Sequence, residues 1–166
     1  MTNRSRILLL PMMLLVPGLL RAGEFPVADE VIIDKSDRVL QLLNKGKIFR
    51  TFKIALGISP TGDKKAEGDF KTPEGRYLLD LRNPNSDYFL SIHVSYPSVA
   101  DRREAKQVGL DPGGDIMIHG QPNLPSHSEA YYQTQDWTNG CIAVSNSDMI
   151  DIWLMTGENT PIEIRP

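Results

Sequence analysis

The sequence predicts a mostly β fold with small helices, an α+β architecture in a single domain. Most apolar runs are short, rich in β-branched residues and separated by turns that contain Gly, Pro or Asn, which is typical of strands. Only the segment from Ser145 to Gly157 carries both a helix start and a helix stop signal. Strands therefore dominate, and residues 23–166 are enough for one domain with its own core.

The first half of this domain is expected to form a β-meander. Three partly alternating apolar runs, at 31–35, 38–43 and 48–56, indicate strands, and residues 44–47 have turn composition. A polar loop that contains several Gly and one Pro follows over 57–68.

The second half is expected to mix strands with short helices. Strands are predicted at 75–81, 89–94, 116–118 and 160–164, turns at 83–86 and 111–114, and a first helix over 101–108 that ends at Gly109. The second helix has the stronger signal, because Ser145–Asp148 has the form of a capping box ahead of an apolar run.

Residues 1–22 have the form of a secretory signal peptide. Arg4 and Arg6 precede an apolar run of 14 residues, Ile7–Leu20, which is too short to span a bilayer comfortably. An uncleaved anchor is the alternative, because Leu20 is bulkier than the residue usual before a cleavage site. We expect an exported protein of the periplasm or cell envelope, with no integral membrane span after signal cleavage.

Net charge excludes two classes of partner. Residues 1–22 hold three of the 18 basic residues and none of the 21 acidic ones, so the remainder has a net charge of −6. An acidic domain without a basic run is not built to bind a nucleic-acid backbone or an anionic lipid surface. We therefore predict no nucleic-acid partner.

Cys141 is the only cysteine of the chain, and in an exported protein it has no partner for an internal disulfide. Such a thiol, with His119 at the end of a predicted strand, is a candidate nucleophile with its base. The following helix and His119 are both expected to lower the pKa of the thiol, which is about 8.5 in a free cysteine. Gly140 would let backbone N–H groups approach a substrate carbonyl, and the Gly120 carbonyl would orient the imidazole.

Simpler interpretations exist for each of these residues. A lone cysteine is often a small buried hydrophobe, and a histidine at a strand end is often structural. We interpret His93 as a hydrogen-bonded structural residue and His127 as solvated. The spacing of the histidines and Cys141 does not resemble a compact zinc site, so neither a metal nor a cofactor is expected.

The candidate residues fall into a longer ordered pattern. His119 is followed, after 18 intervening residues, by Thr138-Asn139-Gly140-Cys141. Three further stretches belong to the pattern. Residues 31–57 end in Leu-Gly, residues 71–77 contain a Thr-Pro-x-Gly-x-aromatic segment, and residues 113–120 begin with Gly-Gly and lead through a predicted strand to His119. Together they resemble the L,D-transpeptidase catalytic domain (YkuD-like) family, from about Val31 to Ile164. The resemblance implies a β-sandwich-like fold.

The resemblance also implies a chemistry and a substrate. Members act on the stem peptides of peptidoglycan, and Cys141 would attack a stem carbonyl to form a thioester acyl-enzyme. His119 would be the base and Gly120 its orienter. Thr138, Asn139 and Gly140 would belong to the oxyanion and binding loop. A neighbouring stem amine would complete a cross-link, and the enzyme is expected to be a monomer.

Two departures from the family pattern leave alternatives open. Asn139 replaces the usual His before Gly-Cys, and Ala143 replaces a frequent Arg or Asn. The alternatives are an L,D-carboxypeptidase or other hydrolase with the same site chemistry, and a catalytically idle wall-binding protein. The loop aromatics Tyr131, Tyr132 and Trp137 either line the substrate groove or pack over the site.

Overall fold

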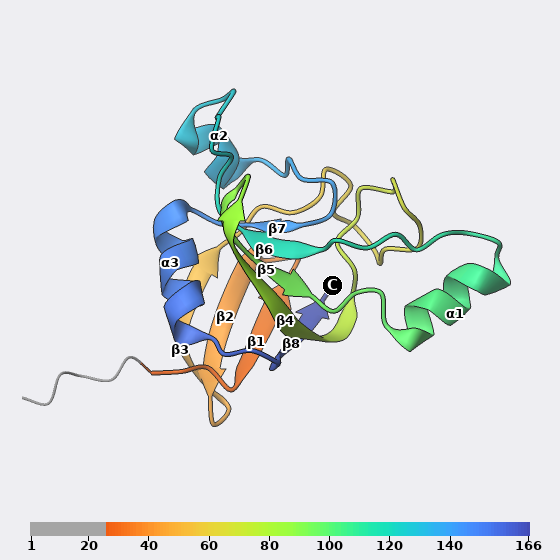
Figure 1. Ribbon diagram of the computed structural model, residues 1–166, viewed down its shortest axis with the longest axis horizontal. Helices are drawn as coiled ribbons and strands as arrows, with labels where there is room; N and C mark the ends of the chain where they lie inside the picture. Colours follow the sequence, from red (N-terminus) through yellow and green to blue (C-terminus); the bar gives the residue numbers. More distant parts are fainter. Residues whose placement is uncertain (1–25) are drawn as a thin grey trace, which may run out of the picture.

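The strands of the protein dominate its structure, as the sequence predicts. The computed structural model describes residues 26–166, so the predicted signal peptide at 1–22 lies outside the described residues. The elements are β1 Glu30–Asp34, β2 Val39–Asn44, β3 Lys47–Lys53, β4 Gly75–Ser86, β5 Phe89–Val94, α1 Val99–Gln107, β6 Met117–His119, α2 Glu129–Thr134, β7 Ile142–Ala143, α3 Asn146–Met155 and β8 Thr160–Arg165 (Figure 1). Within this part of the chain, no helix has the length and apolar composition needed to cross a membrane.

The turn predicted at 83–86 is wrong, because these residues form the last part of β4. β8 pairs with β4 only as far as Leu79, so Pro84 lies where β4 has a single neighbouring strand. The β4–β5 ladder also shifts register between Asn83 and Ser86. A proline is tolerated at such an edge or bulge because its missing N–H breaks no ladder bond.

The helices differ from prediction mainly at their starts. α1 begins at Val99, because Ser98 caps it and forms a capping box with Asp101. The helix predicted after Ser145 is confirmed, with the Ser145 hydroxyl accepting from the Asp148 N–H. The short α2 and the two-residue β7 were not predicted, since each is too brief to show a period.

One sheet contains all eight described strands, in the order β3-β2-β1-β8-β4-β5-β6-β7. The β1–β8 and β6–β7 pairs are parallel and the other pairs are antiparallel. Isolated bridges join Ala55 to Ala143 and Gly57 to Thr138, so the chain after β3 meets β7, the opposite edge. The sheet therefore curls around a common core. α3 packs beside β5, whereas α1 is set apart at one end of the molecule (Figure 1).

The core decides which face of β6 and β7 carries the candidate catalytic residues. Ile118 pairs with Ile142, and both are fully buried in the main hydrophobic cluster. Side chains alternate along a strand, so His119 on β6 and Cys141 just before β7 face away from that cluster, on the same side.

Buried lysines organise the long polar loop between β3 and β4. Lys35 is 2% exposed, and its ammonium donates to the carbonyls of Gly62 and Thr72 at 2.7 and 3.0 Å and to the Glu74 carboxylate at 2.7 Å. A buried cation is tolerated when its protons are all bonded in this way. The ammonium thus ties the middle and the C-terminal end of the loop to the residue that follows β1.

Replacing Lys35 with Met is expected to lower the free energy of unfolding by about 3 kcal/mol, because Glu74 and two carbonyls lose their partner. Urea denaturation of the whole protein measures this change. Lys53→Met is the matched control, since Lys53 is an exposed lysine of β3. Equal effects of the two substitutions would contradict the assigned role of Lys35.

Candidate active site

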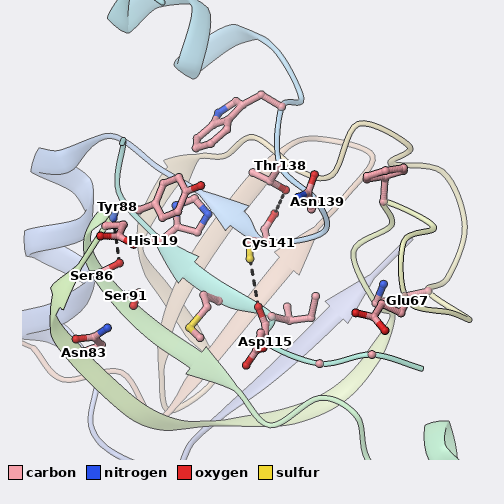
Figure 2. Close-up of a pocket in the computed structure, with 18 of the residues that line it drawn as sticks. Glu67, Asn83, Ser86, Tyr88, Ser91, Asp115, His119, Thr138, Asn139 and Cys141 are labelled. Carbon is pink, nitrogen blue, oxygen red and sulfur yellow. Dashed lines mark hydrogen bonds between the residues drawn. The ribbon is translucent and has the colours of Figure 1, made fainter. Parts of the chain in front are cut away.

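His119 and Cys141 line the same groove, which has a volume of about 640 Å³ (Figure 2). The groove lies over the outward face of β5, β6 and the start of β7. Its walls come from the turn of the β4–β5 hairpin, from the loop over 64–70 and from residues 113–117. Segments far apart in the sequence therefore meet at the thiol.

The His119 ring is held in one orientation. Its Nδ1 lies 2.7 Å from the carbonyl oxygen of Gly120, as the sequence analysis expects. Because a carbonyl only accepts, Nδ1 carries the proton and Nε2 keeps its lone pair. A Cβ on Gly120 would lie 2.6 Å from Asn146 Oδ1 and 3.0 Å from Phe89 Cβ, so this position has no room for a side chain.

Aromatic rings enclose His119. The Tyr88 ring lies 4.6 Å from the imidazole and the Trp137 ring lies 5.5 Å from it, between ring centroids. His119 is only 4% exposed, and this burial lowers the pKa of its imidazole to about 4 although the Gly120 carbonyl acts in the opposite direction. The imidazole is therefore neutral in the resting protein.

The Cys141 thiol is neutral in the resting protein as well. Burial raises the pKa of the thiol above its ordinary value, and the Met117 backbone N–H offsets part of this effect. The expected lowering by a helix is wrong, because the next helix begins only at Asn146, on the far side of β7. The Cys141 Sγ donates to the carbonyl oxygen of Asp115 at 3.5 Å.

The Thr138 hydroxyl shapes the turn that presents Cys141. This hydroxyl donates to the Cys141 carbonyl at 2.8 Å and accepts from the Gly140 N–H at 3.1 Å (Figure 2). Gly140 has φ +129°, and a Cβ there would lie 2.6 Å from the Lys71 carbonyl oxygen, so only glycine fits. The Gly140 N–H is thus used within the turn. Among the described residues the Asn139 and Cys141 N–H groups donate to no acceptor.

The other residues considered as ligands lie elsewhere. His93 Nδ1 is 2.6 Å from the Asp80 carboxylate, and His127 stacks on Tyr131 with centroids 4.2 Å apart. Residues 26–166 contain no group of three His, Cys, Asp or Glu side chains placed to hold a metal ion.

Two of the three loop aromatics divide between the two roles considered for them. Trp137 lines the groove, while Tyr132 is buried behind it and accepts the Trp137 indole N–H at 3.1 Å through its carbonyl. Tyr131 is 37% exposed and lies outside the groove lining. Trp137 therefore faces the groove and Tyr132 supports it, whereas Tyr131 fills neither role considered for it.

Sequence reasoning missed several groove residues, among them Tyr88, Ser91 and Asp115. Ser91 interrupts an apolar strand, which is a visible signal. Its neighbourhood depends on pairing between β5 and β6, which the sequence does not display. Tyr88 and Asp115 lie in turns, where no period exists to read.

Comparison with known proteins agrees with this geometry. The L,D-transpeptidase catalytic domain (YkuD) family profile matches residues 28–164. The chain belongs to this family. The Escherichia coli (strain K12) protein YafK is 32% identical to it over 94 residues, which cover 53% of this chain and 36% of YafK.

Solved structures of other proteins share its fold. The helical cell shape determining protein Pgp2 from Campylobacter jejuni is 31% identical, with a TM-score of 0.62 over 82% of this chain and 46% of Pgp2. Bd1075 from Bdellovibrio bacteriovorus is 24% identical, with a TM-score of 0.56. The match covers 85% of this chain and 51% of Bd1075. The chain thus spans about a third of YafK and less than half of Pgp2.

Stability should fall as the pH drops from about 6.5 to about 4. In this window the unfolded state protonates His119, whose ordinary pKa is about 6.5, while the folded state does not until about 4. The expected loss is about 3 kcal/mol. Urea unfolding at pH 7.5 and pH 4.5 measures it, and the H119Q variant should lack this part of the loss. Identical pH dependence in both proteins would contradict the assignment.

Substitution of Thr138 with Ala should lower the free energy of unfolding by about 1–3 kcal/mol, because the Gly140 N–H and the Cys141 carbonyl both lose a buried partner. Thr138→Ser keeps the hydroxyl and should stay close to the wild type. Denaturation of both variants tests this, and an equal loss in both would point to the methyl group instead.

Proposed function

We propose that the protein is an exported peptidoglycan L,D-transpeptidase that acts through a cysteine acyl-enzyme. The observation that carries the proposal is the placement of a histidine with a free Nε2 on the same face and in the same groove as the lone thiol. Family membership supplies the reaction class, and the residues supply a route for it.

The acylation step needs only these two side chains and a backbone pocket. His119 Nε2 takes the proton of the Cys141 thiol as the sulfur attacks the carbonyl carbon of the third stem residue. The C–N bond to the terminal D-alanine then breaks, and the imidazolium returns the proton to the departing amine. The product is a thioester on Cys141.

The neutral resting forms of the Cys141 thiol and the His119 imidazole suit this order of reaction steps. A thiol with a raised pKa gives little free thiolate, so proton transfer is expected to accompany attack on a bound substrate. A buried imidazole whose pKa is about 4 is a strong acid once protonated, which favours rapid transfer to the leaving amine. Because the thiolate is the form that oxidants attack, the raised pKa of the thiol also slows oxidation of the sulfur until a substrate arrives.

The oxyanion that forms during attack needs donors near Cys141. We assign this role to the Asn139 and Cys141 backbone N–H groups, with Gly140 and Thr138 holding the turn. The side chain of Asn139 is not required for a backbone role, so its difference from the usual His does not argue against turnover. Loss of one such donor typically costs about 10²–10³ in rate.

A stem amine would resolve the thioester to a cross-link, and water would release a tripeptide. The similarity to Pgp2, named a helical cell shape determining protein, supports a role in wall remodelling and cell shape. Export to the periplasm or cell envelope and a monomeric state belong to the same proposal.

Intact-protein mass spectrometry tests the proposal. Incubation with a carbapenem or a stem tetrapeptide should add the mass of one acyl group to Cys141, and C141A should remain unmodified. H119Q should acylate at least about 10²-fold more slowly, because a positioned base typically contributes 10²–10⁴. A folded, reduced wild type that forms no adduct would contradict the proposal.

The product separates transfer from its rivals. A cross-linked dimer indicates transfer, and tripeptide alone indicates hydrolysis. Binding to sacculi that survives in C141A, combined with no reaction by the wild type, would instead favour a wall-binding protein.

A further inference from the structure

Ser91 is a buried hydroxyl that faces the active-site groove. It lies on β5, is only 4% exposed and contributes to the groove lining (Figure 2). Its hydroxyl makes no hydrogen bond with another described residue, although the chain elsewhere pairs its buried hydroxyls, such as those of Thr138 and Thr156. The Ser91 oxygen is not among the fully buried, unpaired side-chain atoms of residues 26–166, so it keeps accessible surface toward the groove, where a bound molecule can reach it.

Strand pairing places this hydroxyl beside the catalytic base. Ser91 is the register partner of His119 on β6 and of Asn83 on β4, so all three side chains lie on the same face. Directly paired residues of antiparallel strands have Cβ atoms about 5 Å apart. Asn83, Ser91 and His119 thus form a row that crosses three strands.

We propose that the Ser91 hydroxyl accepts a hydrogen bond from the primary amine that resolves the acyl-enzyme. The inference rests on the proposed function and adds a residue to its second step. An attacking amine points its lone pair at the thioester carbon, which leaves two N–H bonds to satisfy. His119 Nε2 accepts one of them, and the second needs another acceptor in the groove.

The distribution of carboxylates in the groove favours the side that holds Ser91 as the binding place of the amine. Figure 2 shows Ser91 and Asn83 on one side of Cys141 and Glu67 on the other. Glu67 and Asp115 line the groove, and the Lys64 ammonium is already bound by Asp69 at 2.9 Å.

Carboxylates would hold an amine as its ammonium ion, which has no lone pair for attack. The row formed by Asn83 and Ser91 carries no charge, and Asp87 lies farther along, in the turn of the hairpin. A neutral amine, the reactive form, is therefore favoured beside Ser91.

The step balances with these groups alone. The amine nitrogen forms a new C–N bond to the acyl carbon, and the C–S bond to Cys141 breaks. The proton leaves the nitrogen for His119 Nε2 and passes to the departing sulfur, which regenerates the thiol. Ser91 keeps its own proton throughout and acts only as an acceptor.

Acylation and resolution are measured separately to test this role. The acyl-enzyme is formed with a stem tetrapeptide and followed by intact mass, and a second stem peptide with a free side-chain amine is then added. We expect Ser91→Ala to acylate within about twofold of the wild type and to undergo aminolysis about tenfold more slowly, the effect of one lost hydrogen bond. Ser91→Thr keeps the hydroxyl and should recover most of the rate.

Ser95→Ala is the matched control. Ser95 follows β5, lies outside the groove lining and accepts the Leu78 N–H, so its loss should change neither step once folding is verified by thermal unfolding.

A modified acceptor tests the wild type directly. A mono-N-methylated amine has a single N–H, so it should react about tenfold more slowly with the wild-type acyl-enzyme. The same methylation should have little effect on Ser91→Ala, because the second N–H has no partner there.

Two outcomes overturn the inference alone: unchanged aminolysis in Ser91→Ala, or equal slowing of acylation and aminolysis. Release of tripeptide only, even at saturating amine, overturns the proposed transfer reaction as well. A wild type that never forms an acyl-enzyme overturns the proposed function, and this inference with it.

Discussion

Ile118 and Ile142 lie side by side in the core, on the parallel strands β6 and β7, and neither has any exposed surface. Their burial determines which face of the two strands is turned outward, because side chains alternate along each strand. His119 and Cys141 occupy that outward face. A shift of one residue in the register of either strand would bury the imidazole or the thiol in the hydrophobic cluster. The chemistry of the site therefore depends on a contact between two hydrocarbon side chains that take no part in it.

The backbone geometry at two glycines also positions the groups of the site, in addition to the strand pairing. Gly120 and Gly140 lie where a Cβ would meet another residue at 2.6 Å, and each stands next to one of the two candidate catalytic side chains. The Gly120 carbonyl selects the imidazole tautomer, and Gly140 lets the turn close on the Thr138 hydroxyl. Within residues 26–166 the turn leaves the Asn139 and Cys141 N–H groups without acceptors, as an oxyanion pocket would require.

The far wall of the groove is held by charge. The Lys64 ammonium, only 5% exposed, binds the Asp69 carboxylate and the Ala66 carbonyl. Burial alone would raise the pKa of Asp69, but the bonds from Lys64 and from three backbone N–H groups lower it to about 2. A long polar loop can therefore keep a defined shape without its own hydrophobic core. Its one carboxylate in the groove lining, Glu67, adds negative charge to that side of the groove.

Local patterns in the sequence determined the mostly β architecture, the Ser145 cap of α3, and the candidate pair formed by His119 and Cys141. These features depend on residues near one another in the chain. The sequence predicts that a helix and His119 lower the pKa of the thiol, whereas both groups are neutral in the structure, because burial by segments distant in sequence sets both pKa values. Residues 83–86, predicted as a turn, are strand because they pair with β5. No strand pairs on their other side, so Pro84 is tolerated there. The position of Ser91 beside His119 was also decided by tertiary structure, since strand register arises from the packing of the whole sheet and no short stretch of sequence contains it.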